Sequence, residues 1–381
     1  MLAITEFINN TANWQEILSL EPYYIKIAPS RQDPRYFTLK YTLGASDMSI
    51  ELIRQCRGSI FYDTGSGYEC VCMPFYKFMN YGEPFADDID WTNITVTEKI
   101  DGSLIKFYYH NNMWHIATNG LPNAFECHTD TDDLTFGEVV VKALGNRFEE
   151  FTKGLDTNYC YMFELISDHT VVNIEYHELA LYYLSRRNMT TYQEEQSSEE
   201  LVSHFGLFGI RYPQVHESKA DIEHYIKLVD SYDCTHEGVV VCDKDYHRVK
   251  IKGEEYIKLS HLINNHKVVT TKRVVIHILN NDLDDYLAYI HEGQRPSLLK
   301  KIDQFKMLLK TMEDNYQETL EYSQGKTRKE VAAFVNSRKY LCTEFIFRKL
   351  GNPALTAYEY VTTRMFRCRI IENVDAMASK V

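Results

Sequence analysis

The chain has 381 residues, of which 44% are hydrophobic and 25% charged, and this composition excludes a disordered or collagen-like polypeptide and leaves room for two or three domains. Its formal net charge of -13 also excludes a protein that coats nucleic acid without discrimination, because neutralising phosphates requires Lys and Arg. No stretch reaches the roughly 18 uninterrupted apolar residues of a membrane span, and the first 20 residues lack a basic-then-apolar leader. We therefore expect a cytoplasmic protein that does not bind a membrane. The nine cysteines are scattered, which favours free buried thiols over a metal or disulfide framework.

The first 90 residues combine a predicted helix over residues 11–20 with an extended aromatic stretch over 36–41. From residue 94 to 252 strand patterns dominate, because β-branched and aromatic residues are concentrated in short runs. The predicted strands are 94–99, 104–109, 114–118, 159–166, 171–176, 179–185, 238–242 and 247–251. The polar segments 193–205 and 219–231 are predicted helices, so this part of the chain is expected to be α+β.

The pattern changes after residue 254. Apolar residues now recur at intervals of three and four, as in Leu298, Ile302 and Phe305, which is typical of amphipathic helices. Residues 293–297, which include Pro296, predict a break between two of these helices. The last 120 or so residues are therefore expected to form a helical domain.

The most informative stretch is Glu-Lys-Ile-Asp-Gly-Ser at residues 98–103, between two predicted strands. A lysine held on a tight loop close to other cations can lose its proton and act as a nucleophile. Asp101 and Gly102 would supply a turn with positive φ that presents the Lys99 side chain. Alone, however, this pattern favours an ordinary hairpin turn with a surface lysine.

Further charged residues accompany this motif downstream. Glu164 ends a predicted buried strand, and Glu237 precedes another, where its carboxylate is the type of oxygen ligand that Mg²⁺ prefers. Lys250 and Lys252 are two residues apart in a strand, so their ammonium groups face one side, which suits phosphate. They lie in a positive segment, residues 244–273, with eight basic and three acidic residues. A solvated strand face and turn residues would explain each feature separately.

In their order and spacing these elements resemble the covalent nucleotidyltransferases, the group of ATP-dependent ligases and messenger RNA capping enzymes. The shared pattern is Lys-x-Asp-Gly, an acidic residue after an aromatic strand, Glu-Gly, and a closing Lys-x-Lys, found here at Lys99, Glu164, Glu237, and Lys250 with Lys252. The chain resembles most closely the phage-type RNA ligases that repair cleaved transfer RNA anticodon loops. This resemblance covers about residues 50 to 262, and the further matching positions include Arg57, Lys77, Arg186 and Tyr256.

The resemblance implies a nucleotidyltransferase (adenylation) domain of antiparallel sheets with helices over residues 1–255, followed by an all-helical C-terminal domain over 256–381. It implies that Lys99 attacks the α-phosphate of ATP, that AMP then passes to an RNA 5'-phosphate, and that a 3'-hydroxyl displaces AMP. The implied partners are single-stranded RNA or nicked tRNA, in the cytoplasm of the host cell if the protein is of phage origin. The implied ligands are the nucleotide at Arg57, Lys77 and Glu164, its α-phosphate at Lys250 and Lys252, and Mg²⁺ or Mn²⁺ at Glu237.

Some positions leave alternatives open. Asn119 stands where the resembling proteins carry a basic residue. Asp284 and Asp285 align with an acidic pair implicated in metal binding, although with Asp282 they are more typical of a helix N-terminus. The alternative functions are a DNA ligase, a GTP-using capping enzyme, and an inactive RNA-binding relative. The first two usually have a small β-barrel after the closing lysines, whereas this chain turns helical, and the intact Lys-x-Asp-Gly, Glu-Gly and Lys-x-Lys set disfavours the third. The oligomeric state remains open.

Overall fold

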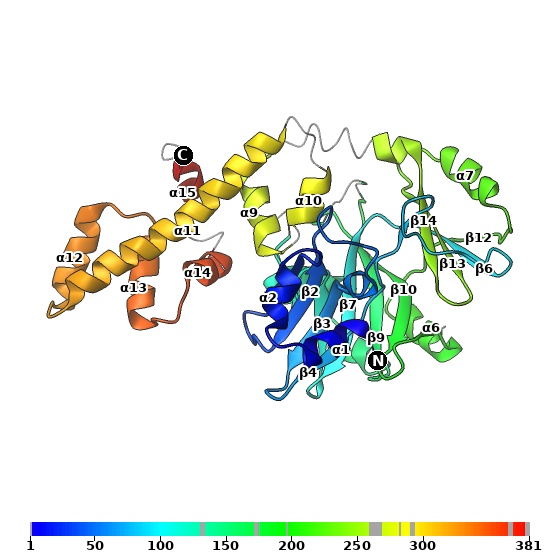
Figure 1. Cartoon of the computed structure of the whole chain (residues 1–381), viewed down its shortest axis with the longest axis horizontal. Coiled ribbons are helices and arrows are strands. Elements are labelled where there is room, and N and C mark those ends of the chain that lie inside the picture. The colour runs from blue at the N-terminus through cyan, green and yellow to red at the C-terminus, as the bar shows by residue number, and fades with distance from the viewer. Residues whose placement is uncertain are drawn as a thin grey trace. The chain divides into compact units, whose positions relative to one another are not determined.

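The computed structural model describes residues 2–129, 134–170, 174, 176–195, 197–258, 269–281, 283–289, 294–364 and 369–377. The chain forms two compact units (Figure 1). The first comprises Met1–His266 and Asn280–Tyr289, and the second comprises Lys267–Leu279 and Ile290–Val381. The segment Asn280–Tyr289, which we placed in the helical domain, thus groups with the first unit, while the domain boundary after residue 255 stays a prediction. In the described parts of the chain, no helix is both long and apolar enough to cross a membrane.

An antiparallel sheet of order β1-β2-β3-β4 forms the N-terminal part of the first unit. Its strands are β1 (Ile25–Pro29), β2 (Tyr36–Tyr41), β3 (Arg57–Asp63) and β4 (Tyr68–Cys72). The helices of this part are α1 (Ala3–Asn10), α2 (Trp14–Ser19) and α3 (Glu51–Gln55). Trp14 of α2 stacks on Phe37 of β2 in the core beneath them. The predicted extended stretch 36–41 is confirmed as β2, and the helix predicted over 11–20 begins only at Trp14.

A second antiparallel sheet has the order β11-β10-β9-β7-β8. Its strands are β7 (Ser103–His110), β8 (Met113–Thr118), β9 (Tyr159–Ile166), β10 (Ala180–Asn188) and β11 (Glu194–Glu195). The helices near it are η1 (Ala124–Glu126), α4 (Phe136–Ala143), α5 (Phe148–Thr152) and α6 (Glu199–Gly206). Phe107, Phe151, Phe163 and Phe205 are buried together in the core that α5 and α6 share with the sheet.

The segment that precedes α6 differs from its prediction. The helix predicted over 193–205 is wrong in its first half, where Glu194 and Glu195 pair with β10 as β11. The helix begins only after Ser198, whose side chain accepts a hydrogen bond from the Leu201 backbone and caps α6. The strand predicted over 171–176 lies mostly outside the described residues.

A third sheet has the order β12-β6-β13-β14-β5, and only the β14–β5 pair is parallel. Its strands are β5 (Met79–Asn80), β6 (Ile94–Glu98), β12 (Val215–His216), β13 (Gly238–Asp243) and β14 (Arg248–Lys252). One face packs against α7 (Ile222–Asp230), with Val96, Val239, Val241 and Val249 buried around Tyr225. Because side chains alternate along a strand, the intervening residues face the other way. Thr97, Val240 and Lys250, which are paired across β6, β13 and β14, therefore share the opposite face.

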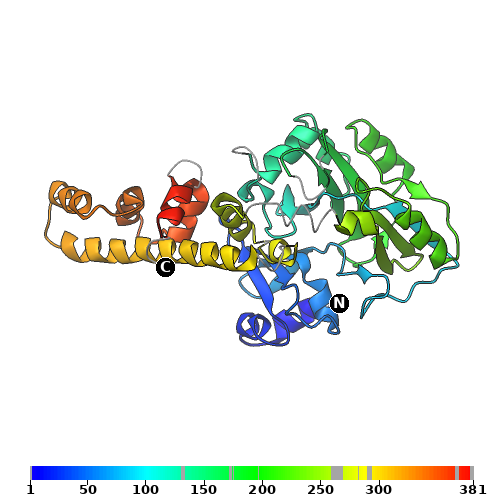
Figure 2. The same cartoon turned by 90° about the horizontal axis from the view of Figure 1, so that it is seen from above.

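The described residues of the second unit are helical. Its helices are α9 (Thr271–Leu279), α11 (Arg295–Ser323), α12 (Arg328–Arg338), α13 (Thr343–Gly351), α14 (Ala357–Arg364) and α15 (Ile370–Ala376), whereas α10 (Leu283–Tyr289) belongs to the first unit. Figure 2 shows the shorter helices along one side of the long helix α11, where Phe305, Leu308 and Met312 are buried. Pro296 lies in the first turn of α11, where its missing N–H costs no hydrogen bond, so it opens this helix instead of lying in the break.

Candidate active site

A cavity of about 960 Å³ lies in the first unit, between the second and third sheets. Its polar lining includes seven of the nine side chains that we singled out from the sequence, namely Arg57, Lys77, Lys99, Glu164, Glu237, Lys250 and Lys252. The remaining two, Asp284 and Asp285, lie on α10. Asp284 forms an ion pair with Lys26. Asp284 is not among the described residues that line the cavity, the side chain of Asp285 lies outside the described residues, and the role of both in metal binding stays a prediction.

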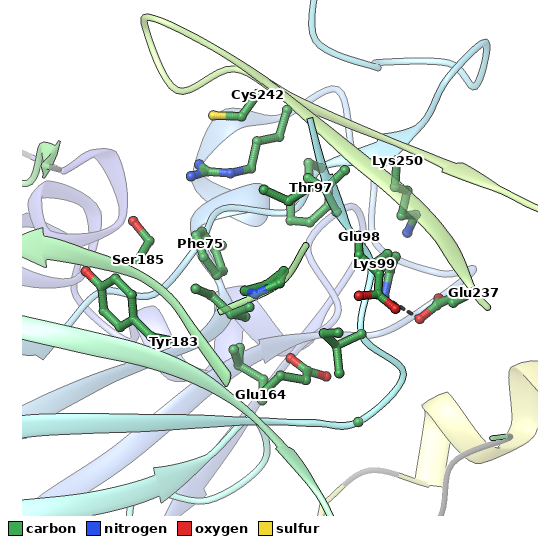
Figure 3. A pocket seen from close by; sticks show the side chains of 18 of the residues that line it. Phe75, Thr97, Glu98, Lys99, Glu164, Tyr183, Ser185, Glu237, Cys242 and Lys250 are labelled. Carbon is green, nitrogen blue, oxygen red and sulfur yellow. Dashed lines mark hydrogen bonds and ion pairs between the residues drawn. The ribbon is translucent and has the colours of Figure 1, made fainter. Parts of the chain in front are cut away.

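Lys99 directly follows β6 and is fixed at both ends. Its backbone N–H donates to the Gly238 carbonyl over 2.9 Å, and its ammonium donates to Glu237 Oε2 over 2.7 Å (Figure 3). The other oxygen of Glu237 lies 2.8 Å from Lys252 Nζ. The Glu237 side chain, only 3% exposed, therefore holds two lysines from opposite sides of the site. Despite burial, which acts in the other direction, these two cations hold the pKa of Glu237 below its usual value.

Gly238 explains why a glycine follows Glu237. Its φ is +145°, and a Cβ at this position would lie 2.0 Å from the Ile251 carbonyl oxygen. A larger residue would push β13 away from β14 and separate Glu237 from Lys252. The Glu-Gly pair is thus a packing requirement of the charged site.

Lys250 is the most perturbed cation in the cavity. Burial, followed by repulsion from Lys77, Lys252, Lys99 and Arg57, lowers its pKa to about 6. Figure 3 shows its ammonium directed toward Lys99 and Glu237. The convergence of Lys250 and Lys252 predicted from their spacing is confirmed, since both line the same cavity.

Lys99 departs from our expectation. We expected neighbouring cations to lower its pKa, but the pKa is raised, because the nearby carboxylates, Glu237 and Glu164 foremost, outweigh the lowering effect of burial. In this structure Lys99 is therefore an ammonium group. Its conversion to a nucleophile requires that the ion pair with Glu237 be broken or neutralised.

Two further carboxylates surround Lys99. Burial, opposed mainly by Lys99, raises the pKa of Glu164 to about 7. Burial also raises the pKa of Asp101, which accepts hydrogen bonds from Tyr256 Oη over 2.9 Å and from the Ile174 backbone over 2.7 Å. Sequence reasoning did not assign Asp101 this anchoring role. Such a side chain, flanked by Lys99 and a glycine, carries no pattern that distinguishes it from a turn residue.

The turn after Asp101 also differs from the prediction. Gly102 is not among the described residues with positive φ. Instead, a Cβ at Gly102 would lie 2.4 Å from the Leu165 carbonyl oxygen and 2.9 Å from Glu164 Cγ. The glycine therefore allows β7 to approach β9 closely, which brings Glu164 next to the lysine.

The side of the cavity away from Lys99 is joined by a buried ion-pair network. Arg248 of β14 contacts both oxygens of Glu194 of β11, at 2.8 and 2.7 Å, and Arg187 of β10 donates to the same carboxylate over 2.8 Å. The third sheet is thereby connected to the second. Sequence reasoning missed this network because it placed Glu194 in a helix.

The positive segment 244–273 does not form one surface. Lys244, Arg248, Lys250 and Lys252 line the cavity, whereas Lys258 is exposed and pairs with Glu254 and Glu255. Lys272 and Arg273 belong to α9 of the second unit, and Lys267 lies outside the described residues. Asn119, noted for lacking charge, does line the cavity.

Comparison with known proteins assigns the family. A family model described as RNA ligase matches residues 55–256, which is more than half of the chain and includes the cavity residues Arg57, Lys77, Lys99, Glu164, Glu237, Lys250 and Lys252. The chain belongs to this RNA ligase family. The RNA ligase of Rhodothermus phage RM378 is 26% identical over 322 residues, which cover 70% of this chain and 72% of that protein.

Two other RNA ligases are similar to this chain. A putative bifunctional polynucleotide kinase/RNA ligase of Autographa californica nuclear polyhedrosis virus is 29% identical over 271 residues. The match covers 66% of this chain but only 37% of the viral protein, so this chain corresponds to about a third of that relative. An archaeal ATP-dependent RNA ligase structure superposes with a TM-score of 0.43 and 14% identity, covering 77% of this chain and 78% of that one.

Proposed function

We propose that this protein is an ATP-dependent RNA ligase that joins RNA 5'-phosphate and 3'-hydroxyl ends through a lysyl-AMP intermediate, in the repair of cleaved tRNA or other RNA. The observation that carries the proposal is the placement of the Lys99 amine beside Glu237, in one cavity with Lys250 and Lys252, in a chain of the RNA ligase family. The arrangement combines a nucleophile with cations that stabilise a phosphate as negative charge develops.

In the first step, Lys99 releases its ammonium proton to solvent, the neutral Nζ attacks the α-phosphorus of ATP, a P–N bond forms, and the P–O bond to the departing pyrophosphate breaks. Lys250 and Lys252 stabilise the charge on the α-phosphate oxygens. Arg57 and Lys77, which line the cavity beside Phe78, bind the polyphosphate, and Glu164 binds the ribose or adenine side of the nucleotide. AMP then passes to the 5'-phosphate of RNA, and the 3'-hydroxyl of the second end displaces it.

The cation that accompanies ATP fits this cavity only in part. Among the described residues, no group of three or more His, Cys, Asp or Glu side chains is placed to hold a metal ion. Mg²⁺ is, however, commonly held by one or two carboxylates together with substrate phosphates, and Glu237 is the carboxylate next to Lys99. When bound, Mg²⁺ or Mn²⁺ supplies positive charge that neutralises phosphate oxygens and favours a deprotonated neighbouring amine.

The substrate is the second part of the proposal. A 5'-phosphorylated single-stranded RNA is expected to be joined or circularised at least tenfold faster than a nicked DNA duplex of the same sequence, in line with the helices that follow β14. The measurement is product formation on a denaturing gel with ATP and Mg²⁺. Faster sealing of the nicked duplex would identify a DNA ligase, and covalent labelling by GTP but not ATP would identify a capping enzyme.

Lys250 gives a prediction about pH. Its pKa of about 6 leaves it mostly neutral at pH 7.5, and an anionic triphosphate raises that pKa, so ATP binding should take up close to one proton. We expect the calorimetric enthalpy of metal-free ATP binding at pH 7.5 to depend on the ionisation enthalpy of the buffer. The uptake should fall at pH 5, where Lys250 is already charged, and should be smaller in Lys250→Met than in the wild type. A binding enthalpy that is the same in all buffers at pH 7.5 would contradict this prediction.

A further inference from the structure

Lys106 is a buried cation behind the cavity wall. It lies in the middle of β7, opposite the small side chain of Ala117 in β8, and is 0% exposed. Its ammonium donates a hydrogen bond to the Gly58 carbonyl. Burying an ammonium group against a neutral acceptor costs free energy, and an apolar side chain of the same length would fill the space equally well. Packing alone therefore does not explain a lysine at this position.

Gly58 connects this ammonium to the cavity. Its φ is +80°, and a Cβ there would lie 2.5 Å from Asn119 Oδ1 and 3.2 Å from Lys106 Nζ. Gly58, Asn119 and Lys106 are therefore in tight contact, and the position admits only glycine. Any displacement of the Lys106 head group moves the start of β3.

Arg57 precedes Gly58 and lines the cavity. Its guanidinium lies 5.5 Å from the centre of the Phe78 ring. Among the described residues, its Nη1 is buried without a hydrogen-bond partner. A buried, unused donor of this kind in a cavity lining points to an anionic ligand that completes it.

We propose that Lys106 is a positioning residue for ATP: it holds the Gly58 carbonyl so that Arg57 is directed at the polyphosphate, and it adds positive potential behind that guanidinium. The inference rests on the proposed function, because it takes the anion to be the ATP polyphosphate. Lys106 acts through Arg57 and does not touch the nucleotide.

The groups that face Lys106 come from several elements. They are Cys72 of β4, Cys160 of β9, Arg57 of β3 and Lys40 of β2. Burial, and repulsion by Arg57 and Lys40, lower the pKa of Lys106 to about 8. Because a lysine in the unfolded chain keeps its proton to about pH 10.4, this residue makes folding more favourable as the pH rises from 8 to 10.4. ATP binding should change in the opposite direction over the same range, which separates the binding role from a structural one.

The test is metal-free binding of ATP, measured by calorimetry, together with the ATP dependence of Lys99 adenylation. Lys106→Met keeps the length of the side chain and removes the charge, so Kd and KM for ATP should rise about tenfold at pH 7, while the rate at saturating ATP changes less than twofold. The matched control is Tyr108→Phe, on the same face of β7, which loses one buried hydrogen bond to the Pro122 carbonyl. It should lower Tm and leave Kd for ATP unchanged.

The pH dependence of ATP affinity is the second measurement, and it can be made even if Lys106→Met does not fold. ATP affinity of the wild-type protein should fall between pH 7 and 9, and a smaller fall should persist in Lys250→Met, in which the other perturbed lysine no longer titrates. A Lys106→Met protein with wild-type Kd, or a Lys250→Met profile that is flat from pH 7 to 9, would overturn the inference while adenylation of the wild type upholds the proposed function. A wild type that neither binds ATP nor becomes adenylated would overturn both.

Discussion

The Lys99→Ala protein is expected to form no covalent adduct with AMP, whereas the wild type becomes labelled when incubated with α-labelled ATP and Mg²⁺. The amine of Lys99 ends the side chain that follows β6 and pairs with Glu237 inside the cavity. Lys252 pairs with the other oxygen of Glu237, and the Lys-x-Asp-Gly motif distinguishes Lys99 from it as the nucleophile. The measurement is radioactivity that remains with the protein after denaturation, and the loss should exceed 1,000-fold, because the bond-forming atom itself is removed.

The control for this experiment separates loss of chemistry from loss of binding. Lys99→Ala should still bind ATP, because Arg57, Lys77, Lys250 and Lys252 remain. It should also still seal an RNA that carries a chemically prepared 5'-adenylate, since that substrate bypasses the lysine. Labelling of Lys99→Ala at the wild-type level would show that another residue is the nucleophile, and Lys250 would be the first to examine, given its pKa of about 6.

Lys250→Ala and Lys252→Ala should each reduce the rate of adenylation by about 100-fold or more, which is the scale of one lost charge contact in a transition state. The two substitutions should differ in their effect on Tm. Lys252 pairs with Glu237 Oε1, so its removal also leaves a 3%-exposed carboxylate with one cation fewer and should lower Tm. Folding holds Lys250 in a site that lowers its pKa through burial and repulsion by neighbouring cations, which costs stability, so its removal should leave Tm unchanged or raise it.

Single-turnover labelling and thermal unfolding of both variants check this prediction. Exposed Lys244, which also lines the cavity but pairs with Asp245, provides the matched control, and Lys244→Ala should label at close to the wild-type rate. Unchanged rates in both test variants would reduce Lys250 and Lys252 to a solvated strand face, the alternative that the sequence left open.

The strands of the first unit could largely be predicted because their patterns are local. The run 159–166 is a strand with the same bounds in the structure, since aromatic residues occupy every second position from Tyr159 to Phe163, which suits the two-residue period of a strand. Glu194 could not be placed in this way. Its neighbours are polar and suit a helix, and only pairing with Arg186 and Arg187 of β10, together with the Ser198 cap, makes the segment a strand.

The site could be predicted in its composition but not in its electrostatics. From the motifs we expected Lys99, Glu237, Lys250 and Lys252 to share one site, and all four line one cavity. Which of these lysines has a lowered pKa depends on distances between residues about 150 positions apart in the chain, and we assigned this property to Lys99 when it belongs to Lys250. Lys106 escaped notice for a related reason, because a single lysine inside a strand reads as an exposed residue until its burial is known.

The Arg248–Glu194 network limits where the cavity can open. It joins the two walls on the side where Cys242 and Ser185 lie, away from Lys99 (Figure 3). Separating the walls there would leave a buried charge without its partner, at a cost of about 3–5 kcal/mol, so the cavity is expected to widen elsewhere. Under the proposed mechanism, pyrophosphate would then leave and RNA would enter through the same opening, and the covalently bound AMP would hold the nucleotide in place between these two steps.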